Sequence, residues 1–155
     1  MLSPASAICI NSVEANHTVR HKTMFTFGRD HEKRCAREYV RNSDQLLLAE
    51  KVVDSVHDLL EGKIGKDAAA SALKKALTEG GSGVWEQAGS WLIKLAKEDS
   101  YFDSIWLELA KHRSANIRFR VASFLSEMKP IIFARLSPLL SADPSARVRL
   151  RASPE

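Results

Sequence analysis

A seven-residue segment occurs twice near the C-terminus, and this internal repeat strongly limits what the chain can fold into. Residues 114–120 read SANIRFR, and residues 145–151, which lie 31 positions later, read SARVRLR. Two apolar patterns with helical spacing lie between the copies, joined by Lys129-Pro130. A helix pair repeated at such a period cannot bury its own apolar face and must stack on a neighbouring unit. The sequence therefore predicts a short helical solenoid.

Helical periodicity extends through most of the chain, and no run of alternating β-branched residues lies between turns. We therefore expect an all-α protein. The expected helices are a charged one at 30–41 and four that are capped by Asn42, Asp67, Ser100 and Ser114. A further one has its apolar residues between Val84 and Ala96, another starts at Pro130, and the last is capped by Asp143-Pro144-Ser145 and runs to Glu155.

Three local details follow from residue type. Gln45 lies three residues after Asn42, as in a capping box, in which its side chain would bond back to the cap. Proline removes a backbone hydrogen bond from a helix, so Pro138 predicts a kink or an early end of the helix that starts at Pro130. Trp91 fits its apolar stripe less regularly than the other tryptophans do, and we expect it to be partly exposed.

Composition divides the chain into three parts. Residues 1–23 show no periodicity and predict a disordered tail. The glycine-rich run Gly80-Gly81-Ser82-Gly83 is the strongest internal break, and we expect it to be the most flexible internal point. It separates an N-terminal helical cap region at 24–79 from repeats over 82–155, which end in a half repeat.

The net charge of +4 is unevenly distributed. Residues 1–110 carry a balance of −2, whereas residues 111–155 carry +6. A basic end on a nearly neutral body favours an anionic partner for that end, unless its arginines serve solubility or the fold. No apolar run approaches the roughly 20 residues of a membrane helix. The two cysteines form no CxxC pair, which is typical of reduced thiols in a cytoplasmic protein.

The second copy of the repeat resembles the HEAT-like repeat signature, in which an Asp precedes a Val-Arg pair and a small residue follows. These residues are Asp143, Val148-Arg149 and Ala152. The first copy keeps Ile117-Arg118, but His112 stands in the place of the Asp, and Ala122 is one position late. The resemblance covers about residues 82–155.

The resemblance implies a right-handed α-solenoid of antiparallel helix pairs, in which the helices that begin with the signature line the concave side. It also implies that the Asp and the Arg of the signature link adjacent units. Arg118 and Arg149 are accordingly expected to be structural.

Residues with catalytic or metal-binding chemistry are present but do not assemble into a recognisable motif. His31 and Cys35 are four apart on a predicted helix, yet zinc normally needs three or four ligands. The loop from Glu79 to Gly83 lacks the Gly-Lys-Ser/Thr ending of a phosphate loop, and Glu79 would repel phosphate, so we interpret it as a linker. We therefore expect no enzyme activity, no cofactor and no metal.

Polar side chains at helical spacing predict a partner-binding face on the concave side. They are Glu86, Ser90, Lys94 and Lys97 on one helix, Asn116, Arg120, Ser123 and Glu127 on the next inner helix, and Arg147 and Arg151 on the last. The face carries both signs of charge, which suits a protein better than a nucleic-acid backbone.

Three functions remain open. The leading hypothesis is a non-catalytic protein-binding module, such as an adaptor, an inhibitor or an immunity protein for a bacterial toxin. The second is a HEAT-like protein that binds nucleic acid through the basic C-terminal end. The third is a structural subunit of a larger assembly, because the half repeat leaves an apolar edge on Val148 and Leu150 that could pair with a second copy or another protein. None of the three requires a membrane.

Overall fold

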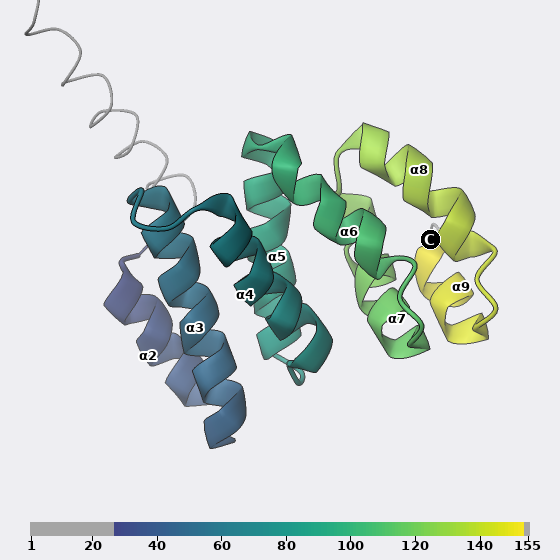
Figure 1. Ribbon diagram of the computed structural model, residues 1–155. Helices are drawn as coiled ribbons and strands as arrows, with labels where there is room; N and C mark the ends of the chain where they lie inside the picture. Colours follow the sequence, from purple (N-terminus) through teal and green to yellow (C-terminus); the bar gives the residue numbers. More distant parts are fainter. Residues whose placement is uncertain (1–26, 154–155) are drawn as a thin grey trace, which may run out of the picture.

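A computed structural model describes residues 27–153, and within this range the chain is all-α, without a strand (Figure 1). The predicted tail at 1–23 lies outside the described residues. The α-helices are α2 (Arg29–Tyr39), α3 (Ser43–Leu60), α4 (Lys66–Glu79), α5 (Val84–Glu98), α6 (Asp103–Leu109), α7 (Ala115–Ser123), α8 (Pro130–Ser141) and α9 (Ala146–Ala152). Two 3-10 turns, η1 (Ser100–Phe102) and η2 (Leu125–Glu127), precede α6 and follow α7.

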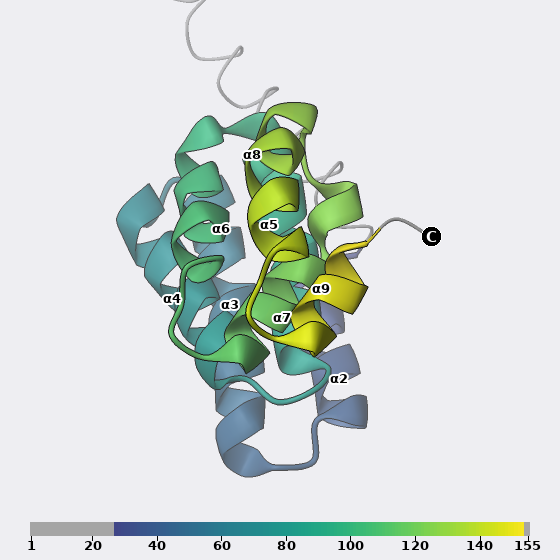
Figure 2. The same ribbon diagram turned by 90° about the vertical axis from the view of Figure 1, so that its right-hand side faces the viewer.

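The helices stand next to one another in chain order, so that α2 and α9 lie at opposite ends of the row (Figure 1). Successive helices pack together from α2 to α5, and α8 packs on α9. Alternate helices are also in contact, namely α3 with α5, α6 with α8 and α7 with α9. Seen along the row, α4 and α6 lie on one side and α7 and α9 on the other (Figure 2).

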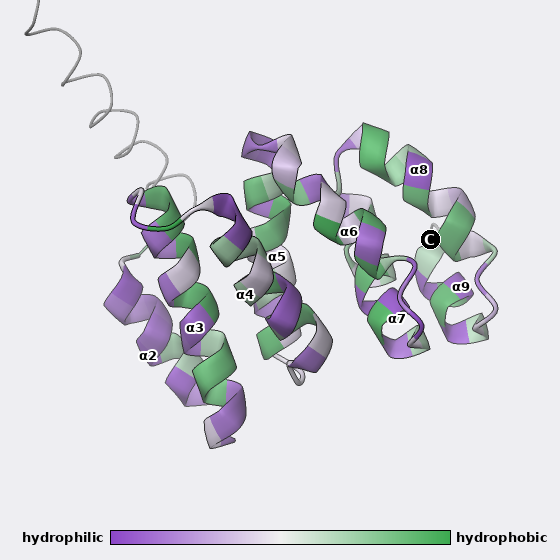
Figure 3. Cartoon of the chain, viewed as in Figure 1, coloured by the Kyte–Doolittle hydropathy of each residue, from purple (hydrophilic) through white to green (hydrophobic). Residues whose placement is uncertain are grey.

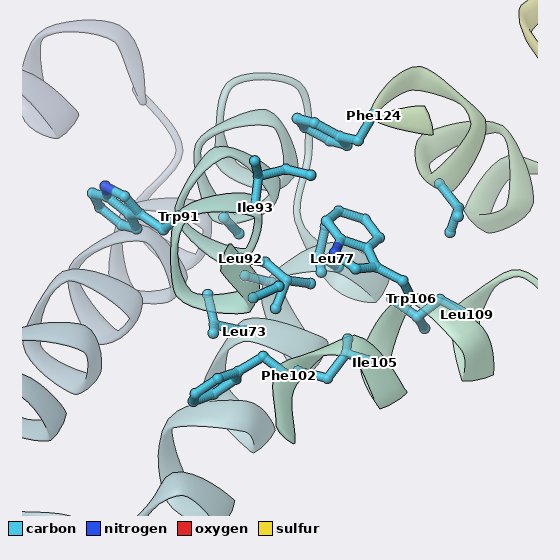
Figure 4. Packing of buried hydrophobic residues seen from close by; sticks show 14 of the residues in the cluster. Leu73, Leu77, Trp91, Leu92, Ile93, Phe102, Ile105, Trp106, Leu109 and Phe124 are labelled. Carbon is cyan, nitrogen blue, oxygen red and sulfur yellow. The ribbon is translucent and has the colours of Figure 1, made fainter. Parts of the chain in front are cut away.

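One hydrophobic core runs through the described chain and passes the glycine-rich break without interruption. The helices carry both hydrophobic and hydrophilic residues (Figure 3). The apolar side chains meet around Leu92 of α5 (Figure 4). Leu73 and Leu77 reach this point from α4, and Ile105 and Trp106 reach it from α6. Helix α5 is therefore the central element of the packing.

Trp91 belongs to this core. Its exposed fraction is 5%, so the expectation of partial exposure is wrong. Helix α5 is buried on more than one side, by Trp91 and Ile93 as well as by Leu92 and Ala96. Trp91 lies seven residues after Val84, three after Ala88 and four before Leu95, and these are the spacings of one helix face, so the apolar periodicity itself places Trp91 with the core.

The predicted cap at Asn42 is confirmed, because its side chain accepts from the backbone N–H of Asp44 (3.0 Å) and of Gln45 (3.1 Å). The capping box is wrong. Gln45 reaches away from its own helix: its Oε1 accepts from the N–H of Gly81 (2.5 Å) and its Nε2 donates to the carbonyl of Glu79 (3.3 Å). Gln45 thus ties the start of α3 to the α4–α5 loop.

Two other predicted caps, Asp67 and Ser100, do not form. Helix α4 starts after Gly65 without a side-chain cap, and Asp67 instead accepts a hydrogen bond from the hydroxyl of Tyr101. Asp99, not Ser100, accepts from the N–H of Tyr101 (2.9 Å) and starts the turn that leads into α6. Both acidic side chains serve contacts that sequence spacing alone did not identify.

The last two helices differ from expectation in length. Pro130 occupies the first turn of α8, as predicted. The helix continues past Pro138 to Ser141, so the predicted early end is wrong. Helix α9 ends at Ala152 and not at Glu155, with Ser153 in an extended conformation.

Candidate functional site

The two copies of the repeated segment make the same local contacts. Nη1 of Arg118 donates to the carbonyls of His112 (2.8 Å) and Arg113 (3.1 Å). Nη1 of Arg149 donates to the carbonyls of Asp143 (2.6 Å) and Pro144 (2.9 Å). The acceptors lie six and five residues before the arginine in both cases, so the sequence repeat is also a structural repeat.

An ion pair joins the two copies. The guanidinium of Arg118 donates through Nε to Oδ2 of Asp143 (2.6 Å) and through Nη2 to Oδ1 (3.0 Å). Asp143 is buried, and the hydrogen bonds from Arg118 hold the pKa of its carboxyl below the ordinary value. The bidentate geometry fixes the orientation of α9 on α7.

His112 takes over the capping role of the aspartate that the first copy lacks. Oδ1 of Asp143 accepts from the N–H of Ser145 (2.8 Å) at the start of α9. At the equivalent place before α7, Nδ1 of His112 accepts from the N–H of Ser114 (3.1 Å). Imidazole can accept one hydrogen bond through its unprotonated nitrogen, so the difference between histidine and aspartate in the two copies preserves the turn.

Half of the predicted partner-binding residues come together around one hollow of about 400 Å³. It lies between α5, α7, η2 and α9, and is lined by Trp85, Glu86, Ser90, Phe119, Ser123, Phe124, Glu127 and Arg151. The residues come from positions 85 to 151, so only the packing of α5, α7 and α9 brings them together. The aromatic residues of this set were not part of the predicted face.

The hollow has an aromatic floor and a charged rim. The rings of Trp85 and Phe124 meet edge to face, with 5.9 Å between their centroids. Glu86 and Glu127 are exposed, and neither forms an ion pair with any residue in 27–153. Across from them, Nε of Arg151 donates to the hydroxyl of Ser123 (3.3 Å). The hollow therefore offers two carboxylates, one guanidinium and apolar surface to a ligand.

The other predicted residues surround this hollow or lie apart from it. Arg147 stacks on Phe119 with 3.9 Å between its guanidinium carbon and the ring centroid, and its Nη1 lies 3.4 Å from Oδ1 of Asn116. Arg147 and Asn116 are exposed and extend the polar surface beyond the rim of the hollow. Lys94 and Lys97 are exposed on α5 but do not line the hollow.

Arg120 does not line the hollow. Its Nη1 donates to the carbonyls of Leu77 (2.6 Å) and Thr78 (3.3 Å) at the end of α4, and its guanidinium lies 5.5 Å from the ring centroid of Trp85. Burial lowers its pKa. A cation at the C-terminal end of a helix binds carbonyls that have no partner within that helix. Arg120 thus attaches α7 to α4.

The basic C-terminal end is largely used by the fold. Lys129 forms an ion pair with the buried Asp103 (2.7 Å), in addition to the contacts of Arg118 and Arg120. Lys111, Arg113 and Arg135 are the basic residues of 111–153 that are exposed and for which no side-chain contact is found within the described chain. Lys111 and Arg113 lie in the connection between α6 and α7 and Arg135 lies on α8, so these three cations do not form a continuous positive stripe.

The candidates for chemistry remain isolated. Sγ of Cys35 lies 3.4 Å from Nε2 of His31, and no group of three His, Cys, Asp or Glu residues that could hold a metal occurs in the described part of the chain. In the glycine-rich loop, the N–H of Gly81 is bonded to Gln45, and a φ of +85° at Gly83 favours glycine in this turn. This loop is a packed connection in the described fold.

Comparison of the chain with protein families, with curated proteins and with solved structures gives no match. None of the helices within residues 27–153 is both long and apolar enough to cross a membrane.

Proposed function

We propose that this protein is a cytoplasmic, non-catalytic protein-binding module that receives its partner in the hollow between α5, α7, η2 and α9. The observation that carries the proposal is the composition of the hollow: Glu86, Glu127 and Arg151 around Trp85, Phe119 and Phe124. Aromatic residues and arginine are the side chains that contribute most to protein–protein binding, and a polar rim around them excludes water.

The architecture that we propose is a short right-handed, HEAT-like α-solenoid of antiparallel helix pairs. Three observations support it: the matching backbone contacts of Arg118 and Arg149, the ion pair of Arg118 with Asp143, and the contact of α7 with α9. In such an architecture α5, α7 and α9 are successive inner helices, and the hollow spans two steps of the stack.

The charges around the hollow favour a protein over a nucleic acid. A phosphate backbone would be repelled by Glu86 and Glu127. Arg151, which lines the hollow, and Arg147, which stacks on Phe119, both lie on α9. A protein surface that carries both signs of charge can satisfy all of them. We expect a partner with at least one basic group opposite the glutamates and an acidic group opposite Arg151.

Charge reversal tests the proposal. The tagged full chain is expressed in its source cells, and co-purifying proteins are quantified by mass spectrometry for wild type, Arg151→Glu, Glu127→Lys and the control Arg135→Glu on α8. We expect one partner protein to be retained by wild type and by the control Arg135→Glu. Its recovery should fall at least tenfold with Arg151→Glu and with Glu127→Lys. Equal recovery of every protein by all four chains would contradict the proposal.

The nucleic-acid alternative has its own test. Gel retardation with a 30-base-pair duplex and with a single strand of the same length, at about 50 mM salt, should show no shift at micromolar protein. A shift that disappears between about 50 and 200 mM salt and is weakened by Arg113→Glu would instead favour the basic C-terminal end as a nucleic-acid site.

A further inference from the structure

Helix α9 packs on a surface of α7, and α9 carries the same kind of surface on its own outward side. On α7, Arg118 holds the carboxylate of Asp143, and Phe119 lies under the guanidinium of Arg147. These two contacts come from the segment that leads into α9 and from α9 itself. Together they show what the repeated segment binds when a further helix stacks on it.

The same positions on α9 are Arg149 and Leu150. Arg149 keeps both backbone bonds of its counterpart and its charge helps to lower the pKa of Asp143, but within residues 27–153 it forms no ion pair with a carboxylate. Leu150 is 78% exposed, whereas its counterpart Phe119 is partly buried. Val148, which was expected to contribute to an apolar edge, is fully buried, so the edge consists of Leu150 beside Arg149. The surface of Arg149 and Leu150 therefore repeats the groups with which α7 binds Asp143 and Arg147.

We propose that the surface formed by Arg149 and Leu150 binds a helix of a partner protein, and that the loop just before this helix carries an aspartate. The aspartate would bind the guanidinium of Arg149 with the same bidentate geometry that Asp143 has on Arg118. A long side chain of the partner helix would cover Leu150, just as Arg147 covers Phe119. A second copy of this chain fits less well, because the carboxylate of its Asp143 is already bound bidentately by its own Arg118. The proposal rests on the repeat geometry and is independent of the hollow.

An added repeat tests the docking chemistry directly. The full chain is extended by a further copy of residues 123–153, placed after Ser153 so that the added aspartate can reach Arg149. Because residues in contact are energetically coupled, changing the added aspartate to asparagine should lower the midpoint of thermal unfolding by about 2–4 °C. That difference should vanish when Arg149→Met is also present, and it should persist with the control Arg113→Met. An identical midpoint with the added aspartate or asparagine would overturn the proposal.

Two measurements on the unextended chain test the choice of partner. Sedimentation at up to about 100 μM should show a monomer, and a dimer abolished by Leu150→Glu would overturn the proposal in favour of a second copy.

Among proteins captured from source cells, we expect one to be lost with Arg149→Asp but retained with Arg151→Glu. Its binding to Arg149→Asp should return when its own helix-capping aspartate is changed to arginine, and failure to rescue would contradict the assigned contact. Loss of proteins with Arg151→Glu but of none with Arg149→Asp would overturn the proposal.

Discussion

Arg118 and Arg120 lie two residues apart on α7, and each binds a different part of the molecule. Arg118 binds the carboxylate of Asp143, whereas Arg120 binds the last carbonyls of α4. Positions two apart on a helix point roughly 200° away from each other, so one short segment reaches a later and an earlier element at once. The repeat identified the role of Arg118, but nothing in the sequence indicated that residue 120 faces the end of α4.

The pair of Arg118 and Asp143 makes stability depend on pH. Asp143→Asn keeps the size of the side chain and its bond to the N–H of Ser145 but removes the charge, so we expect a loss of about 1–3 kcal/mol at pH 7. Because Arg118 holds the pKa of Asp143 below its unfolded value of about 3.9, the contribution is complete above that value and disappears as pH falls through the folded pKa. The difference in the free energy of unfolding between wild type and variant should therefore be constant from pH 7 to 5 and shrink below pH 4.

Urea unfolding at a series of pH values measures this difference. Glu38→Gln, at an exposed position on α2, serves as the control and should change little at any pH. A difference between wild type and Asp143→Asn that is as large at pH 3 as at pH 7 would show that the charge of Asp143 does not stabilise the fold.

At the scale of helices, the position of most elements follows from the apolar periodicity, while their ends depend on distant partners. Asn42 acts within its own helix, and the sequence predicts it correctly. Gln45 and Asp67 fit local capping rules equally well, but a loop amide and the hydroxyl of Tyr101 bind them instead. Capping rules describe local competition, and they fail where a tertiary contact offers a better partner.

Helix α5 approaches the segment after α7 through a glycine. A methyl group at Gly89 would come within 2.2 Å of the ring of Phe124, which is itself buried against Trp85 and Trp106. Alanine is the better helix former by about 1 kcal/mol, yet we expect Gly89→Ala to lower the free energy of unfolding by about 1–3 kcal/mol. A glycine inside a helical pattern is a signal for such close approach that the sequence already contained.

The neighbouring Ser90→Ala is the matched control, because Ser90 is exposed on the same turn and should tolerate alanine within about 0.5 kcal/mol. Chemical denaturation of both variants makes the comparison. If Gly89→Ala were as stable as Ser90→Ala, the packing of α5 against Phe124 described above would be wrong.

For the whole molecule, the sequence predicted an all-α chain and one polar face, and half of that face lines a single hollow. Glu86 and Ser90 are four residues apart on α5, so helical spacing alone puts them on one side of that helix, whereas Glu127 reaches the hollow from the turn η2. That these residues bind a partner stays a prediction. The sequence could not show that Phe119 and Trp85 line the hollow. Aromatic residues near an apolar stripe are normally core, and only the packing of three helices leaves their edges open to the hollow.

The central claim is that a partner protein binds the hollow, and site-specific photo-crosslinking in the source cells tests it most directly. A photoreactive amino acid is placed at Ser90 and at Ser123, which line the hollow, and at Ser71 and Ser104, which lie on α4 and α6. We predict that the first two positions yield the same crosslinked protein and that the last two do not yield it. A partner that crosslinks from Ser71 or Ser104 but not from Ser90 and Ser123 would contradict the claim.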